Sequence, residues 1–130
     1  MIPKFRAWDK EFKEMVHVNA LVFDEQVIKA TYQNGNIVKE DVKNYELMQS
    51  TGLKDKNGKE IFEGDILAIE TYEGILNVNI FWDRKHALFM FESKKYNEKD
   101  LLAELVEDNT YPFEIAGNIY ENPELLEVKS

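Results

Sequence analysis

The chain has 130 residues, 44% of them hydrophobic and 12% aromatic, so it holds enough apolar material for a core and is not disordered overall. It contains no cysteine, which excludes a disulfide framework and thiol chemistry and agrees with a reducing compartment. Its 16 basic and 25 acidic side chains give a net charge of −9, which disfavours general binding to nucleic-acid backbones.

The first residues predict neither a targeting segment nor a membrane anchor. The start "MIPKFRAWDK" has no apolar stretch behind a basic cluster, so we expect no signal peptide. No apolar run approaches the roughly 20 residues that a membrane-spanning helix requires. We therefore expect a cytoplasmic protein that does not associate with membranes.

The first third of the chain predicts an antiparallel meander of β-strands. Four runs rich in strand-forming residues make this pattern: 5–9, 15–23, 27–33 and 36–41. Asn34-Gly35 lies between the last two runs and is a strong hairpin signal. We interpret it as a type I′ turn, in which both central residues adopt positive φ.

The stretch "TGLKDKNGKEIFEGDIL" (residues 51–67) combines charges with several turn signals. Asn57-Gly58 predicts a second hairpin. Gly64 predicts a tight turn, which the carboxylate of Asp65 can cap. We interpret all of these turn residues as structural.

The same stretch has an alternative interpretation as an anion-binding loop. Lys54, Lys56 and Lys59 would then present their ammonium groups to a negatively charged partner. The glycines, however, lack the spacing of a phosphate-binding loop, and no Gly-Lys-Ser/Thr sequence follows them. We favour a solvated hairpin and keep the three lysines as candidate binding residues.

The segments 75–83 and 86–93 predict two further strands. In the first of them, apolar and polar residues alternate. This alternation places four side chains on one face, which we expect to be buried: Leu76, Val78, Ile80 and Trp82. A last strand is expected at residues 112–121, with a helical turn starting at Pro123.

One segment has helical rather than strand periodicity. Four apolar residues recur at helical spacing and predict the buried face of a short α-helix near residues 98–107: Leu101, Leu102, Leu105 and Val106. Asn97 is the expected N-cap, with Asp100 at the third helical position. Strands joined by short turns, with one late helix, predict a mainly-β fold of antiparallel strands.

Neither the turns nor the composition marks a long linker, so we expect a single domain over residues 1–130. A division into two β subdomains, about 1–46 and 47–130, is the alternative.

Candidate catalytic and metal-binding residues are sparse. His17 and His86 lie in separate predicted strands and no cysteine accompanies them, so we predict no metal site and no cofactor. Acidic pairs lie at predicted turns, where carboxylates are solvated, and no serine has the context of a nucleophile elbow. We therefore predict that the protein is not an enzyme.

Trp8 and Arg6, together with Trp82 and Arg84, have two interpretations. They could form a platform on which nucleic-acid bases stack. The alternative is a set of core aromatic side chains with flanking surface arginines, which we favour for Trp82 because it continues an apolar face. Trp8 and Arg6 remain candidate binding residues.

Three blocks of the sequence resemble the signature segments of the YopX family: "FRAWDKEFKEM" (5–15), "LMQSTGLKDKNGKEIFEGDIL" (47–67) and "FEIAGNIYENPELL" (113–126). They keep their order and cover about a third of the chain. The resemblance implies a mainly-β fold with an SH3-like barrel element. It also implies a phage- or prophage-derived protein in the host cytoplasm, and it supplies no catalytic or binding residues.

We predict from these observations an accessory protein that acts by protein binding or assembly. The expected partner is a second copy of the chain, because exposed sheet edges must be paired or covered, and a host or phage protein is the other candidate. One alternative is an acidic DNA mimic or inhibitor that uses residues 98–127, since residues 98–130 carry two basic and nine acidic side chains. Another is weak single-stranded nucleic-acid binding through the N-terminal half.

Overall fold

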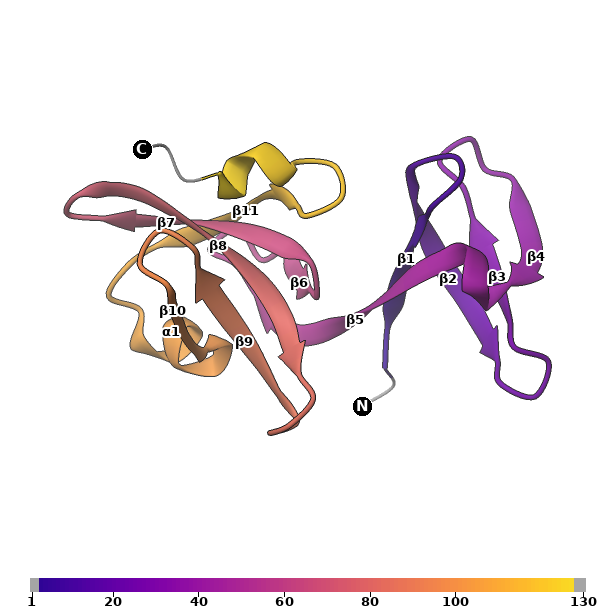
Figure 1. The fold of residues 1–130 in the computed structure, drawn as a ribbon, viewed down its shortest axis with the longest axis horizontal. Helices are drawn as coiled ribbons and strands as arrows, with labels where there is room; N and C mark the ends of the chain where they lie inside the picture. Colours follow the sequence, from indigo (N-terminus) through magenta and orange to yellow (C-terminus); the bar gives the residue numbers. More distant parts are fainter. Residues whose placement is uncertain (1–2, 128–130) are drawn as a thin grey trace. The chain divides into compact units, whose positions relative to one another are not determined.

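The structure is a computed structural model and describes residues 3–127 of the chain (Figure 1). The chain forms two compact units, Met1–Ser50 and Thr51–Ser130, which we call unit 1 and unit 2. It passes from the first to the second within strand β5 (Tyr45–Lys54). Both units are built from antiparallel strands, which confirms the predicted mainly-β fold.

Unit 1 is a sheet in the order β4-β3-β2-β1-β5. Its elements are β1 (Phe5–Asp9), β2 (Glu14–Val22), β3 (Val27–Thr31), β4 (Ile37–Asp41), the 3₁₀ turn η1 (Val42–Asn44) and the first part of β5. Side chains alternate between the two faces, and one face carries the buried core: Ala7, Val16, Ile28, Ala30 and Tyr45. Ala7 lies opposite Val16 of β2 and Leu47 of β5, which places all three side chains on this face.

Unit 2 contains a second sheet in the order β10-β9-β8-β7-β11. Its elements are β6 (Glu60–Phe62), β7 (Asp65–Thr71), β8 (Gly74–Asp83), β9 (Leu88–Ser93), β10 (Glu98–Leu101), α1 (Leu102–Asp108), β11 (Phe113–Asn118) and η2 (Pro123–Leu126). The buried core joins side chains from β6, β7, β8, α1 and β11: Ile61, Leu67, Ile69, Val78, Ile80, Leu102 and Phe113.

The buried face of β8 ends earlier than expected. Val78 and Ile80 are buried and Leu76 packs against the core, as predicted. Trp82, two residues further along, is 37% exposed, so the prediction that it is a core residue is wrong. The strand extends past the core at this point, and the indole packs edge-on against Phe89 of the neighbouring strand, 4.8 Å between ring centroids.

The helix is shorter and begins later than the periodicity predicted. Residues Glu98–Leu101 form strand β10 on the edge of β9, and α1 covers only Leu102–Asp108. Asn97 has φ 51° in the turn before β10 and is therefore not the N-cap. Pairing with β9 satisfies backbone groups that the first helical turn would otherwise leave without partners, so the sheet edge outweighs the local helical pattern.

The two Asn-Gly hairpins form, but with a different turn from the one expected. Gly35 and Gly58 have φ of 91° and 78°, while neither preceding asparagine is among the residues with positive φ. In the second hairpin the N–H of Gly58 donates to the carbonyl of Asp55 (3.0 Å), and the N–H of Asp55 donates to the carbonyl of Lys59 (2.9 Å). This is a three-residue loop in which a type I turn is followed by a left-handed glycine.

The β5–β6 hairpin is hydrogen bonded to β11 through Asp55, which is 7% exposed. Its Oδ1 accepts the N–H groups of Asn57 and Lys59, both at 2.9 Å, and its Oδ2 accepts the N–H of Ile115 at 3.0 Å. The N–H of Lys56 also donates to the carbonyl of Phe113 (3.2 Å). The β5–β6 hairpin, which we call the Asp55 hairpin, thus covers the β11 edge of the unit 2 sheet. The sheet is open, and the SH3-like barrel element stays a prediction.

We expect Gly58→Val to lower the free energy of unfolding by about 1–3 kcal/mol, because a β-branched residue is strained at positive φ. A Cβ at this position would meet no atom within 4 Å, so crowding does not add to the loss. Urea denaturation measures the change. Gly58→Asn should recover most of the stability, and Lys56→Glu should cost little. Equal losses for Val and Asn would show that backbone strain is not the cause.

Candidate protein-binding surface

Exposed aromatic, apolar and charged side chains gather at the two opposite ends of the unit 2 sheet. Because the strands are antiparallel, the β7–β8 and β9–β10 turns lie at one end of the sheet and the β8–β9 turn lies at the opposite end (Figure 1). We call the first the Tyr72 end, defined by Tyr72, Ile75, Tyr96, Glu98 and Asp100. We call the second the Arg84 end, defined by Trp82, Arg84, Lys85 and Leu88.

The Tyr72 end exposes three large apolar or aromatic side chains. Tyr72 is 93% exposed, Ile75 60% and Tyr96 47%. The tyrosines are nevertheless held in place. The ring of Tyr72 meets Tyr111 edge-on, 5.8 Å between centroids, and the hydroxyl of Tyr96 donates to the carboxylate of Glu73 at 3.1 Å. Exposed tyrosines are enriched in protein interfaces.

Two hollows adjoin these side chains, and Leu76 lines both. The first has a volume of about 260 Å³ and is lined by Ile75, Leu76, Asn77, Lys94, Lys95, Leu125, Leu126 and Glu127. Its wall is fixed because the side-chain amide of Asn77 donates to the carbonyl of Leu125 at 3.0 Å. The second has a volume of about 380 Å³ and is lined by Leu76, Phe91, Ser93, Tyr96, Glu98, Lys99 and Asp100.

The second hollow combines aromatic rings with carboxylates. Glu98 lies opposite Ser93, and Asp100 lies opposite Phe91, so these side chains share one face of the sheet. Within the described residues neither carboxylate forms an ion pair, whereas Lys99 on the other face pairs with Glu92 at 3.9 Å. The ammonium of Lys95 lies over the ring of Tyr96, 5.4 Å from its centre, so one ring of the hollow already has a cation beside it. The two carboxylates beside the ring of Phe91 are the part of the hollow that suits a further cationic group.

The lysines proposed from the sequence lie elsewhere in unit 2. Lys54 ends β5, and Lys56 and Lys59 belong to the Asp55 hairpin. The ammonium of Lys56 forms an ion pair with Glu70 at 3.3 Å, and Asn57 donates to Glu114 at 3.2 Å. This loop is thus connected to neighbouring strands.

Arg6 and Trp8 lie in unit 1, on the sheet face opposite Ala7 and the core. Both are partly buried and both have further interactions.

Sequence reasoning missed Tyr72 and Tyr96. The only available signal was their position beside turn residues, Glu73-Gly74 for the first and Asn97 for the second. A tyrosine in such a place is compatible with either exposure or burial, and the choice depends on how neighbouring turns pack. Only the structure shows both rings at the same end of the sheet.

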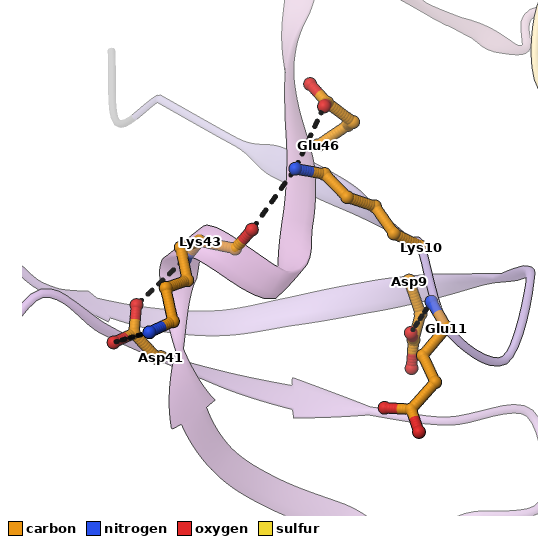
Figure 2. Close-up of polar contacts among 6 residues, drawn as sticks. All are labelled: Asp9, Lys10, Glu11, Asp41, Lys43 and Glu46. Carbon is orange, nitrogen blue, oxygen red and sulfur yellow. Dashed lines mark hydrogen bonds and ion pairs between the residues drawn. The ribbon is translucent and has the colours of Figure 1, made fainter.

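A polar cluster joins the β1–β2 turn of unit 1 to η1 (Figure 2). The ammonium of Lys10 donates to the carbonyl of Lys43 at 3.1 Å and forms an ion pair with Glu46 at 3.2 Å. Asp41 caps η1 by accepting the N–H of Lys43 at 2.9 Å. Partly exposed ion pairs contribute little free energy, so the cluster is best explained as local turn structure.

Unit 1 also contains a network of phenols and carboxylates. The hydroxyl of Tyr32 donates to Asp9 and lies 2.6 Å from the hydroxyl of Tyr45, which in turn donates to Glu40 at 2.9 Å. Burial and the hydrogen bond to Asp9 raise the pKa of Tyr32. Burial alone would raise the pKa of Asp9, but hydrogen bonds from Tyr32 and two turn N–H groups outweigh it and lower that pKa.

At neutral pH Tyr32 is therefore protonated and Asp9 is ionised. Neither group titrates near pH 7, where a general acid or base works best. The network fits a structural role at the edge of the unit 1 core.

Residues 3–127 contain no group of three or more His, Asp or Glu side chains placed to hold a metal ion. Within the same range, no helix combines the length and the apolar character that a membrane crossing requires.

The fold defines a small mainly-β protein of two antiparallel units. The chain belongs to the YopX protein family, because the family model matches residues 4–127. It resembles the crystal structure of protein EF1440 from Enterococcus faecalis, with 35% sequence identity and a TM-score of 0.68, over 98% of this chain and 99% of that one. No curated protein matches the chain.

A second solved structure, protein yopX from Bacillus subtilis, has a TM-score of 0.62 over 95% of this chain and 98% of that one. At 21% sequence identity, this likeness shows the fold alone.

Proposed function

We propose that this chain is a phage- or prophage-derived accessory protein of the host cytoplasm, and that it acts by binding proteins, copies of itself included, rather than by catalysis. The observation that carries the proposal is the Tyr72 end. Tyr72, Ile75 and Tyr96 are exposed there, and Ile75 and Tyr96 each line one of the two hollows. Exposed apolar groups that gather in one place, with polar groups around them, are typical of interaction sites.

Self-association through these side chains is favoured over pairing of sheet edges. The edge strand β4 carries Lys39 at its centre, and in a symmetric antiparallel pair about that residue two copies would place like charges opposite each other. The edge strand β10 is short, and three of its four residues are charged. The opposite edge, β11, is covered by the Asp55 hairpin. Contacts through the exposed side chains of the Tyr72 end require no pairing of β4, β10 or β11.

Light scattering tests the proposal. We expect the purified chain to have the mass of an oligomer at micromolar concentration. The double variant Tyr72→Ala/Ile75→Ala should shift it towards the monomer, because the substitutions remove exposed apolar area without touching the core. Phe23→Ala, at an 81% exposed position of unit 1, is the matched control and should change nothing. A wild-type monomer at that concentration would contradict self-association.

The acidic surface of residues 98–127 supports the DNA-mimic alternative. The exposed side of α1 carries Glu104, Glu107 and Asp108. If the chain imitates a nucleic-acid backbone, Glu104→Gln/Glu107→Gln should abolish capture of a DNA-binding protein from host cells. Retained capture by this variant, together with loss in the Tyr72→Ala/Ile75→Ala variant, would instead favour the Tyr72 end.

A further inference from the structure

The Arg84 end exposes two cations without partners in the described part of the chain. The carboxylate of Asp83, the nearest acidic group in the sequence, already has other partners. It accepts the N–H of Lys85 at 3.0 Å and lies 2.8 Å from the ring of His86. Arg84 and Lys85 are exposed and form no ion pair with any described residue. Their positive charges therefore point outward on a chain whose net charge is −9.

Apolar side chains accompany these two cations. Trp82 is 37% exposed and Leu88 43%, and they flank the turn on the two strands that it joins. The Arg84 end thus has the composition of an interface anchor, in which an arginine stands beside a tryptophan.

The Tyr72 end has the complementary composition. Its larger hollow places Glu98 and Asp100 beside the ring of Phe91, and beside the ring of Tyr96, whose face is already covered by the ammonium of Lys95 at 5.4 Å. A guanidinium matches such a site because it can bind a carboxylate through two parallel hydrogen bonds and can stack on an aromatic ring.

The two ends cannot meet within one copy. Strand β9 separates them, and its six residues span about 20 Å. The Arg84 turn of one copy can reach the hollow only in a second copy.

We infer that the β8–β9 turn of one copy docks on the Tyr72 end of a second copy, with the Arg84 guanidinium in the hollow between Tyr96, Glu98 and Asp100. This inference rests on the proposed function, since it names the surface through which copies bind. Trp82 and Leu88 lie against the exposed apolar side chains of the Tyr72 end. Charge complementarity favours a second copy over nucleic acid, because phosphates would meet the two carboxylates at this hollow.

The contact joins two different surfaces, so each copy offers one turn and one hollow. Such a head-to-tail contact repeats and produces a closed ring or an open filament, according to the rotation between neighbours. Because it depends on exposed charges, the assembly should weaken as ionic strength rises.

Charge reversal on both sides tests the inference. We expect Arg84→Glu to raise the dissociation constant of the assembly by about ten-fold or more, since like charges would then meet in the hollow. The double variant Glu98→Lys/Asp100→Lys should have the same effect, because it places lysines against Arg84. Mixing the two variants should restore assembly, since each provides the partner that the other lacks. Sedimentation velocity on each variant and on the mixture measures the two losses of assembly and its recovery.

The matched control is Glu104→Lys/Glu107→Lys, which makes the same change in net charge on α1. It should leave assembly unchanged, and thermal melts should show that all variants are folded. If wild-type chains assemble but the variants do so equally well, or if mixing restores nothing, the contact lies elsewhere, and the inference fails while self-association stands. An equal loss in the α1 control would attribute the effect to net charge and would also overturn it. A monomeric wild type removes the proposed self-association itself.

Discussion

Leu102→Ala should lower the free energy of unfolding by about 2–5 kcal/mol, the range found when a large buried aliphatic side chain is truncated and leaves a cavity. Leu102 is the first residue of α1 and is fully buried in the unit 2 core, beside strands that lie far from it in the sequence. The core there is close-packed, so neighbouring side chains can only partly fill the space. Chemical denaturation with unchanged slope measures the loss.

Substitutions at other positions of α1 are the controls, because the loss of stability should follow the burial of each side chain. Leu105 is only partly buried, so Leu105→Ala should cost distinctly less than Leu102→Ala. Glu104→Ala, on the exposed side of the same helix, should be nearly neutral. If all three substitutions cost the same, propensity or local unfolding would explain the losses and core packing would not.

Asp55→Ala should be the second large effect. The substitution removes the acceptor of three backbone N–H groups, those of Asn57, Lys59 and Ile115. A buried donor that loses its partner costs about 1–3 kcal/mol, and the N–H of Ile115 lies within β11. Asp55→Asn should also destabilise the protein, because its single carbonyl oxygen cannot replace two carboxylate oxygens that bind donors on different sides.

The dependence on pH provides an independent check. Burial raises the pKa of Asp55, but the hydrogen bonds from Ile115, Lys59 and Asn57 outweigh burial and hold that pKa below its ordinary value of 3.8. A carboxylate with a lowered folded-state pKa stabilises the fold fully above the unfolded value, and this stabilisation disappears as pH falls through the folded value. Wild type and Asp55→Asn should therefore differ most near neutral pH and converge in acid. Asp24→Asn, at an exposed turn, is the control substitution and should leave the free energy of unfolding at neutral pH nearly unchanged.

The strands of unit 1 illustrate what local sequence can predict. Alternation over residues 5–9 and the Asn34-Gly35 signal lead directly to β1 and to the β3–β4 hairpin. Both depend on neighbours in the sequence, namely the period-2 pattern and the need for a residue that tolerates positive φ. The details of the turn differed, because a type I turn followed by glycine uses the same two residues as type I′.

The candidate site was much less predictable. The sequence pointed to Lys54, Lys56 and Lys59, and the structure ties their loop to β7 and β11 through Lys56 and Asp55. Tyr72 and Tyr96 are 24 positions apart and gave no shared signal, yet one hydrogen bond to Glu73 joins their turns. Whether the two tyrosines are exposed and lie close together depends on which turns lie at the same end of the sheet. The strand order β10-β9-β8-β7-β11 decides which turns these are.

By itself, the sequence determined the strand-rich character of this protein, its hairpins, its acidic charge and its YopX family membership, because these depend on residue type and short-range spacing. Only the tertiary structure decided that Glu98–Leu101 pairs with β9 instead of starting the helix, that Trp82 emerges from the core, and that Asp55 joins a hairpin to β11. In each case the structure that the local sequence favours competes with contacts to backbone or core residues that are distant in the sequence. The distant partner prevails where it satisfies hydrogen bonds or buries apolar area that the local structure leaves exposed.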